Sequence, residues 1–167
     1  MTVRDRHAPP LAFDSVTCRF GDGPKSVTAV DDVSLCLEAG ELTALMGPSG
    51  SGKSTLLHLA AGMVRPTSGA VQVAERDVGA MSAAASAEMR RDTVGVVFQA
   101  YNLIPTLTAI ENVTLPMEFA GTPHSKSHAA AEAALARVGI PEPLDRYPVV
   151  QALGGLRPRH DLILTDT

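Results

Sequence analysis

The feature that most constrains this chain is a glycine-rich stretch, Gly47-Pro48-Ser49-Gly50-Ser51-Gly52-Lys53-Ser54-Thr55. It fits the pattern G-x-x-x-x-G-K-[ST] at every fixed position, which is the pattern of a phosphate-binding P-loop. The apolar run 41–46 before it predicts a buried strand. The run 56–61 behind it, followed by Gly62, predicts a short helix that ends at a glycine. This context favours a P-loop over a chance glycine-rich turn.

Each residue type in the stretch suits phosphate chemistry. Gly47, Gly50 and Gly52 let the backbone turn tightly and approach a ligand closely, because glycine tolerates positive φ. The turned backbone points N–H groups inward as a nest for phosphate oxygens, and a helix that begins near Gly52 adds the positive end of its dipole. Lys53 would place a positive charge on the outer phosphates. The Ser54 hydroxyl is a suitable ligand for Mg²⁺, a hard cation that prefers oxygen.

Composition narrows the class of protein. The 167 residues suggest one domain, and a hydrophobic content of 45% is enough for a core. A net charge of −4 indicates no nucleic-acid-binding surface. Cys18 and Cys36 lack metal-ligand spacing, so we expect reduced thiols. No segment resembles a signal peptide or a membrane span, so we expect a cytosolic chain that another protein would hold at any membrane.

The remaining pattern predicts a sheet that starts antiparallel and then alternates with helices. We expect a helix that begins at a Thr108–Glu111 capping box and is interrupted or kinked by Pro116. An alternation of this kind argues for α/β layers with the ligand at the carboxyl ends of the strands. The other predicted elements are strands at 11–20, 27–37 (broken near Asp31-Asp32), 70–74, 94–98 and 161–167, and helices at 82–91 and 127–138.

Together these motifs resemble the ATP-binding subunit of an ATP-binding-cassette (ABC) transporter, and most closely the macrolide-export and lipoprotein-release branch. The resemblance covers about residues 11–150. The segments that carry it are Val30-Asp31-Asp32-Val33-Ser34-Leu35, the stretch Leu45–Leu57, Pro66-Thr67-Ser68-Gly69, Val96-Val97-Phe98-Gln99, Tyr101-Asn102-Leu103-Ile104-Pro105, Thr108–Val113, Leu115-Pro116 and Ala120-Gly121.

The resemblance implies a role for several positions. Phe20 matches the aromatic residue that stacks on adenine, although a core residue at a strand end is the alternative for it. Gln99 matches the glutamine that touches Mg²⁺ and couples the site to the membrane partner. Asp166 matches the aspartate that holds Mg²⁺ through water, against the alternative of an ordinary terminal acid. The implied cofactors are ATP and Mg²⁺, with Ser54, Gln99 and Asp166 as the metal set.

The resemblance also implies an architecture and partners. The expected fold is a P-loop NTPase with an antiparallel β subdomain at the N-terminus and a helical subdomain, incomplete at the C-terminus. We expect a single domain over 11–167, with an ATP-binding core at 11–98, a glutamine loop and helical subdomain at 99–150 and a metal-binding strand at 159–167. The implied partners are a membrane permease subunit and a second copy that joins at the ATP sites. The implied location is the cytoplasmic face of the cell membrane.

The C-terminal part departs from the family, whose LSGGQ signature precedes a helix and the metal-binding strand. Residues 146–158 read RYPVVQALGGLRP. In one alignment Ala152–Leu156 is a degraded signature, and in the other, which we prefer, Ala152-Leu153 ends the helix after the signature. Either way roughly ten or more residues are missing, about the length of a three-turn helix.

Thr167 occupies the position of the glutamate that would polarise the attacking water, and threonine is no base near neutral pH. The family's later D-loop and switch histidine have no counterpart, and His7, His58, His124, His128 and His160 are interpreted as non-catalytic. We therefore expect nucleotide binding to survive better than turnover. We also expect marginal stability, because a shortened core leaves a sheet edge uncovered. One alternative is a non-catalytic remnant or pseudo-ATPase. Another is a different P-loop kinase, although the Gln99 region argues against it.

Overall fold

The computed structural model describes residues 8–140 and 162–165. The chain divides into two compact units, Met1–Val97 with His160–Thr167 and Phe98–Arg159. The first unit carries both sheets and the glycine-rich loop, and the second carries two of the helices.

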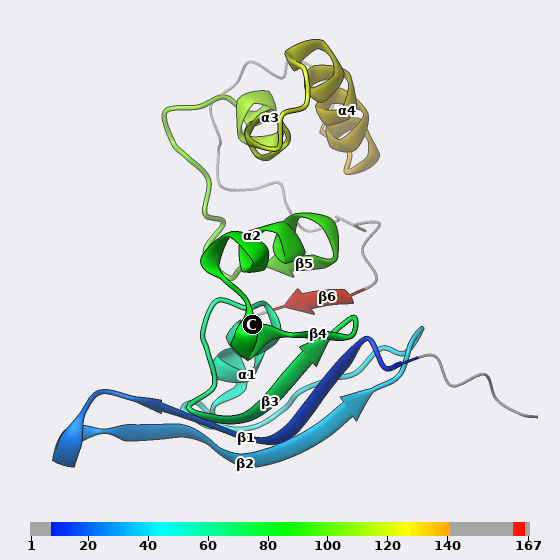
Figure 1. Cartoon of the computed structure of the whole chain (residues 1–167). Coiled ribbons are helices and arrows are strands. Elements are labelled where there is room, and N and C mark those ends of the chain that lie inside the picture. Colours follow the sequence, from blue (N-terminus) through cyan, green and yellow to red (C-terminus); the bar gives the residue numbers. More distant parts are fainter. Residues whose placement is uncertain (1–7, 141–161, 166–167) are drawn as a thin grey trace, which may run out of the picture. The chain divides into compact units, whose positions relative to one another are not determined.

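A four-stranded antiparallel sheet dominates the first unit (Figure 1). Its strands are β1 (Leu11–Phe20), β2 (Val27–Leu37), β3 (Ser68–Val73) and β4 (Arg76–Asp77), in the order β2-β1-β3-β4. The predicted strands at 11–20, 27–37 and 70–74 are confirmed. A short 3₁₀ turn, η1 (Gly23–Lys25), lies between β1 and β2, and a second, η2 (Val78–Ala80), follows β4.

The predicted break at Asp31-Asp32 is wrong, because β2 continues through these residues as a bulged strand. Asp32 has a φ of 50°, and the β1–β2 register shifts between Val16 and Cys18. The Thr17 hydroxyl accepts the N–H of Asp32 at 3.1 Å, so a side chain takes over the bond that the ladder loses. Two adjacent aspartates therefore mark a change of register and not a strand end.

One hydrophobic cluster holds the first unit together. Helix α1 (Lys53–Ala60) contributes Leu59, and helix α2 (Ala83–Asp92) contributes Met89 to the same cluster as the inward-facing side chains of β1 and β3. Val71, Val73, Leu59 and Met89 have no exposed surface. Ser82 is the N-cap of α2, and its hydroxyl accepts the N–H of Ala85 at 3.2 Å, which confirms the predicted helix at 82–91 within one residue at each end.

The predicted buried strand at 41–46 is wrong. Residues 41–48 form no strand, and Leu42 and Met46 are 101% and 84% exposed. A strand needs a neighbour for its N–H and C=O groups, and no described strand pairs with this segment. The apolar pattern reports a segment that is suited to burial, but it carries no information about whether a neighbouring strand is present.

A second sheet pairs β5 (Val94–Val97) with β6 (Leu162–Thr165) in parallel. This confirms the predicted strands near 94–98 and 161–167 over these shorter ranges. Val94 is completely buried, whereas Val97 at the carboxyl end is 38% exposed. The register places Val97 opposite Thr165, so the two strands end at the same edge.

Helices α3 (Ala109–Phe119) and α4 (His124–Arg137) form the described part of the second unit and pack through Ile110, Ala131 and Leu135. The predicted helix at 127–138 is confirmed as α4. Of the two outcomes expected at Pro116, the interruption is wrong, because α3 runs through it to Phe119, and the kink stays a prediction. Proline removes a single N–H donor from a helix, and the packing of α3 on α4 holds the remaining turn in place.

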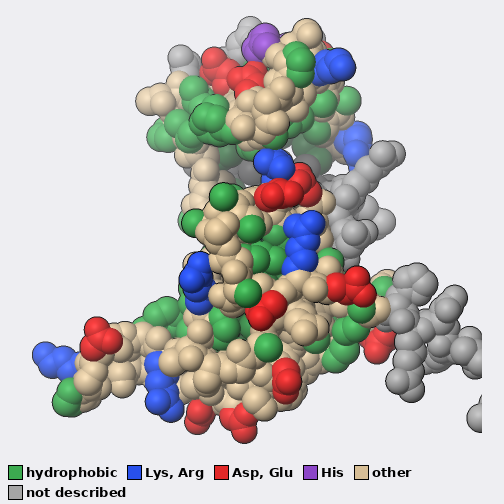
Figure 2. All heavy atoms as spheres, viewed as in Figure 1, with side chains coloured by type: hydrophobic (Ala, Val, Ile, Leu, Met, Phe, Trp, Pro, Cys, Tyr) green, Lys and Arg blue, Asp and Glu red, His purple; other side chains and the backbone are tan. Residues whose placement is uncertain are grey.

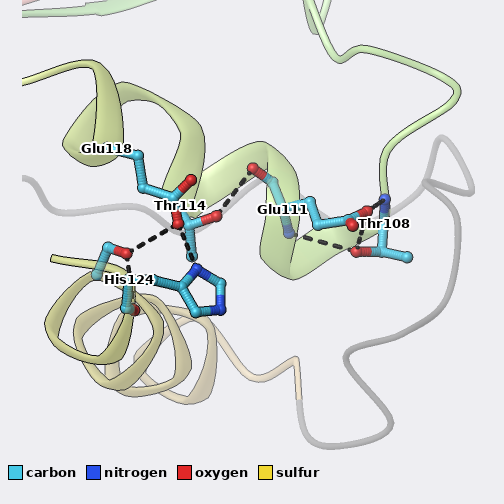
Figure 3. A network of polar contacts seen from close by, with 6 residues as sticks. Thr108, Glu111, Thr114, Glu118 and His124 are labelled. Carbon is cyan, nitrogen blue, oxygen red and sulfur yellow. Dashed lines mark hydrogen bonds and ion pairs between the residues drawn. The ribbon is translucent and has the colours of Figure 1, made fainter.

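Polar side chains cap α3 at its start and connect its end to α4 (Figure 3). At the start of α3 the Thr108 hydroxyl accepts the N–H of Glu111 at 3.3 Å, and the Glu111 carboxylate accepts the N–H of Thr108 at 2.7 Å. This is the predicted capping box. At the other end Glu118 accepts from the His124 ring at 2.6 Å and from the buried Ser127 hydroxyl at 3.1 Å.

Within the described part of the chain, none of the helices has the length and apolar character that a membrane span requires.

Candidate phosphate-binding site

The glycine-rich loop adopts the tight turn that the motif predicts. Gly50 and Gly52 have φ values of 80° and 86°, a left-handed conformation that other residues rarely adopt. Helix α1 then begins at Lys53, with Gly52 as its N-cap, and its first internal bond runs from the N–H of Leu56 to the carbonyl of Gly52 at 2.9 Å. The N-terminus of α1 therefore opens directly onto the loop, as an anion site requires.

Gly52 is also a point of close backbone approach. A Cβ atom built on it would collide with the Ala29 carbonyl of β2 and would lie 3.5 Å from Val30 Cγ2. Gly47 is different, since its φ is not positive, and a Cβ there would lie 2.8 Å from the Ser51 hydroxyl. The loop is therefore seated on β2 at one glycine and folded on itself at another.

Lys53 folds back over the loop. Its Nζ donates to the carbonyls of Gly47 at 2.9 Å and Pro48 at 2.8 Å and to the Ser51 hydroxyl at 3.3 Å. A second turn constraint is the bond from the N–H of Ser51 to the carbonyl of Pro48 at 3.2 Å. These contacts keep the ammonium group beside the loop backbone, where it would meet the oxygens of a phosphate placed in the nest.

The loop residues fit a magnesium–phosphate group. Ser49 and Ser54 are exposed, and Ser54 and Thr55 lie in the first turn of α1, so hydroxyl oxygens lie at the same helix end as the lysine. Hydroxyl and phosphate oxygens are the hard ligands that Mg²⁺ prefers. A side chain at Gly52 would meet the backbone of Ala29, and one at Gly47 would meet the Ser51 side chain, so the loop can pack this closely only with glycine at both positions.

Phe20 lies at the end of β1 and is 45% exposed, so the alternative of a core residue is wrong. Its partner across the ladder is Val27, two residues before Ala29, which meets Gly52. Two residues along a strand span about 7 Å. The backbone of Phe20 therefore pairs with the part of β2 that leads to Ala29.

The other predicted residues are distributed differently. Gln99 is exposed and follows the end of β5 by two residues, at the start of the second unit. Asp166, Thr167 and the segment 146–158 lie outside the described residues, although β6, which leads to Asp166, is present. His58 lies within α1, and His124 and His128 pair with Glu118 and Glu132 in the second unit. His7 and His160 also lie outside the described residues.

Charge elsewhere is dispersed. On the face that Figure 2 shows, Lys and Arg side chains alternate with Asp and Glu side chains. Burial raises the pKa of the Cys18 thiol, which keeps it protonated.

Sequence reasoning missed Asn112 as a structural centre: its amide makes four hydrogen bonds to the segment 104–108. An Asn in the first turns after a Thr-Ala-Ile-Glu cap was the only signal available.

A glycine turn that leads into a helix N-terminus, with a lysine beside it and an antiparallel sheet against it, defines a P-loop nucleotide-binding protein with an α/β fold. The sequence model of the family described as "ABC transporter" matches residues 30–157. The chain belongs to the ABC transporter family, as a member of its ATP-binding domains.

Individual relatives agree with this assignment. The chain is 42% identical over 160 residues to the methionine import ATP-binding protein MetN of Cereibacter sphaeroides. The aligned region covers 94% of this chain and 45% of the relative. It is 40% identical over 151 residues to the macrolide export ATP-binding/permease protein MacB of Marinobacter nauticus. That aligned region covers 90% of this chain and 23% of the relative. The match to MacB agrees with the branch expected from the sequence. The chain spans less than half the length of either relative.

Among solved structures, the chain is similar to the dimeric ATP-binding cassette MJ0796 in a post-hydrolysis state bound to ADP and Pi. The TM-score is 0.75 at 33% identity, covering 83% of this chain and 61% of the other. A second dimeric structure of the same bacterial ABC transporter cassette gives the same TM-score. The fold of an ABC ATPase cassette is therefore confirmed.

Proposed function

We propose that this chain is the nucleotide-binding part of an ABC transporter, which binds Mg·ATP at the loop 47–55. The observation that carries the proposal is the geometry at the start of α1, where two left-handed glycines, a helix N-terminus and Lys53 converge. Phe20 stacks on the adenine, Ser54, Gln99 and Asp166 serve the metal, and the loop holds the phosphates.

The proposed work of the bound nucleotide is to drive transport through a membrane permease partner. Two copies would join across their ATP sites, and the permease would hold them at the cytoplasmic face of the membrane. Support for the dimer is the dimeric state of the similar cassette bound to ADP and Pi. MetN is named as an importer and MacB as an exporter, and we propose export because the segments within 96–121 resemble the macrolide-export branch.

We further propose that the chain hydrolyses ATP weakly. Phosphoryl transfer in P-loop enzymes depends on positioning and on charge stabilisation, and the phosphate loop, the lysine and the metal ligands are all present in the sequence. Thr167 stands in place of the water-activating glutamate, and residues 146–158 lack a complete signature. Binding without efficient turnover is the expected behaviour of that combination.

The test is Mg·ATP binding by calorimetry on the purified chain, followed by a phosphate-release assay. Binding with little release supports the proposal, and release at the rate of an intact ABC ATPase would contradict the role given to Thr167. A Thr167→Glu variant should raise the rate if the missing carboxylate limits it. Absence of binding, with the fold intact by circular dichroism, would contradict the nucleotide site itself. Phosphate transfer to an acceptor other than water would favour the kinase alternative.

A further inference from the structure

The side chain of Asn112 forms hydrogen bonds with the backbone of residues 104–108, a few positions after Gln99. Its Oδ1 accepts the N–H of Ile104 at 2.8 Å. Its Nδ2 donates to the carbonyls of Ile104 at 3.1 Å, Leu107 at 3.1 Å and Thr108 at 2.9 Å. One side-chain amide thereby pairs with one N–H group and three C=O groups of the turn 104–108.

The contacts to Ile104 have the form of a strand pairing, since the same residue donates its N–H and offers its carbonyl to one side chain. The N–H of Leu107 closes the turn on the carbonyl of Ile104 at 3.1 Å. Asn112 itself belongs to α3, whose backbone bond from Asn112 to Thr108 is 3.0 Å long. The turn 104–108 is therefore tied to the helix and not only to its chain neighbours.

Helix α3 is a firm base for this attachment. The capping box of Thr108 and Glu111 secures its first turn. Ile110, which is 5% exposed, packs with Ala131 and Leu135 of α4. Anything that Asn112 holds is consequently held by the packed part of the second unit.

The segment between Gln99 and Ile104 has little else to fix it. None of its described side chains is buried, and Tyr101 and Ile104 are 50% and 41% exposed. Asn102 adopts a φ of 50°, so the chain turns sharply there. On the C-terminal side of Gln99, the bonds from the Asn112 amide to Ile104 are the first hydrogen bonds between the described part of this segment and α3.

We propose that Asn112 is a positioning residue for Gln99: by clamping Ile104 to α3 it sets the course of the segment that carries the glutamine, and so the contribution of Gln99 to metal-dependent nucleotide binding. This inference rests on the proposed function. Asn112 does not touch the nucleotide, and the effect of changing it must pass through Gln99.

The matched variants are Asn112→Asp and Asn102→Asp. Both convert an amide to a carboxylate in the same part of the chain. The carboxylate introduced at position 112 could no longer donate and would face three carbonyl oxygens, whereas the Asn102 side chain makes no hydrogen bond to any other described residue. The experiment measures amide hydrogen exchange over 104–108 without nucleotide, and ATP affinity by calorimetry with Mg²⁺ and with EDTA. Each variant is also made in a Gln99→Ala background.

The expected result is faster exchange over 104–108 in the Asn112→Asp variant only. The gain in ATP affinity from Mg²⁺ should fall by about fivefold in that variant, the worth of one polar contact, while affinity in EDTA stays unchanged. In the Gln99→Ala background, Asn112→Asp should cause no further loss, because both changes remove the same contribution.

Two outcomes overturn the inference while leaving the proposed function intact. One is an equal magnesium effect in Asn112→Asp and Asn102→Asp when the unsubstituted chain binds Mg·ATP normally. The other is a full additional loss in the Gln99→Ala background, which would show that Asn112 acts by another route. Failure of the unsubstituted chain to bind ATP overturns the proposed function, and this inference with it.

Discussion

The substitution Gly52→Ala tests how the loop is seated on the sheet. Gly52 has a φ of 86°, and a Cβ atom there would collide with the Ala29 carbonyl of β2. Gly40 has a φ of 78°, and a Cβ there meets nothing within 4 Å. The two glycines have similar positive φ values and differ in surroundings, so Gly40→Ala is the matched control.

The magnitudes follow from these two environments. A left-handed conformation costs an alanine about 1–2 kcal/mol, and the reduced entropy of the unfolded chain returns about 0.4–1 kcal/mol. Gly40→Ala should therefore lower the free energy of unfolding by about 1 kcal/mol. Gly52→Ala adds a clash with backbone atoms that cannot rotate away, and overpacking of this kind costs about 1–3 kcal/mol. The expected difference between the variants is about 2 kcal/mol.

The assay is urea unfolding followed by circular dichroism, with ATP binding measured on the same samples. With a denaturant slope of about 2 kcal/mol per molar, the midpoint of Gly52→Ala should lie about 1 M below that of Gly40→Ala. ATP affinity should fall at least about tenfold in Gly52→Ala, because the loop must move away from β2, and should be unchanged in Gly40→Ala. Equal midpoints for the two variants would refute the close approach of Gly52 to Ala29.

Three further predictions concern single side chains. Thr108→Ala should destabilise the second unit by about 1 kcal/mol, measured by urea unfolding. It should also raise the pKa of Glu111, which the hydrogen bonds to Thr108 hold below its usual value. An unshifted Glu111 titration by NMR would count against the capping box. The bond to His124 lowers the pKa of Glu118 in the folded chain. The stability that this carboxylate contributes is therefore fully present above pH 4.5 and is lost as the pH falls through the lowered pKa of the folded state. A Glu118→Gln variant should lose less stability than the parent chain over that acid range, measured by urea unfolding at each pH. Lys53→Met should reduce ATP affinity at least about tenfold, because a charged contact to phosphate is lost, with little change in the unfolding midpoint; unchanged affinity would exclude Lys53 as a phosphate ligand.

Features that depend on neighbours along the chain were predictable from the sequence. The turn at Gly50 and Gly52, the start of α1 and the capping box at Thr108 and Glu111 follow from φ preferences and from bonds that span three or four residues. The candidate phosphate site is almost wholly of this kind, since its donors come from one loop and the helix that follows it. That is why its residues could be named before the structure was known.

Features that depend on distant partners were decided by the tertiary structure. The segment 41–46 has the composition of a buried strand and yet pairs with no described strand, because hydrogen-bonded neighbours are not encoded in its own residues. Helix α3 passes through Pro116 because packing against α4 outweighs one missing donor. The contact of Gly52 with Ala29 and the clamp of Asn112 on Ile104 join residues 23 and 8 positions apart. The sequence by itself thus determined the local phosphate loop, and the folded chain alone decided what that loop and the Gln99 segment rest on, since such contacts depend on where remote backbone comes to lie.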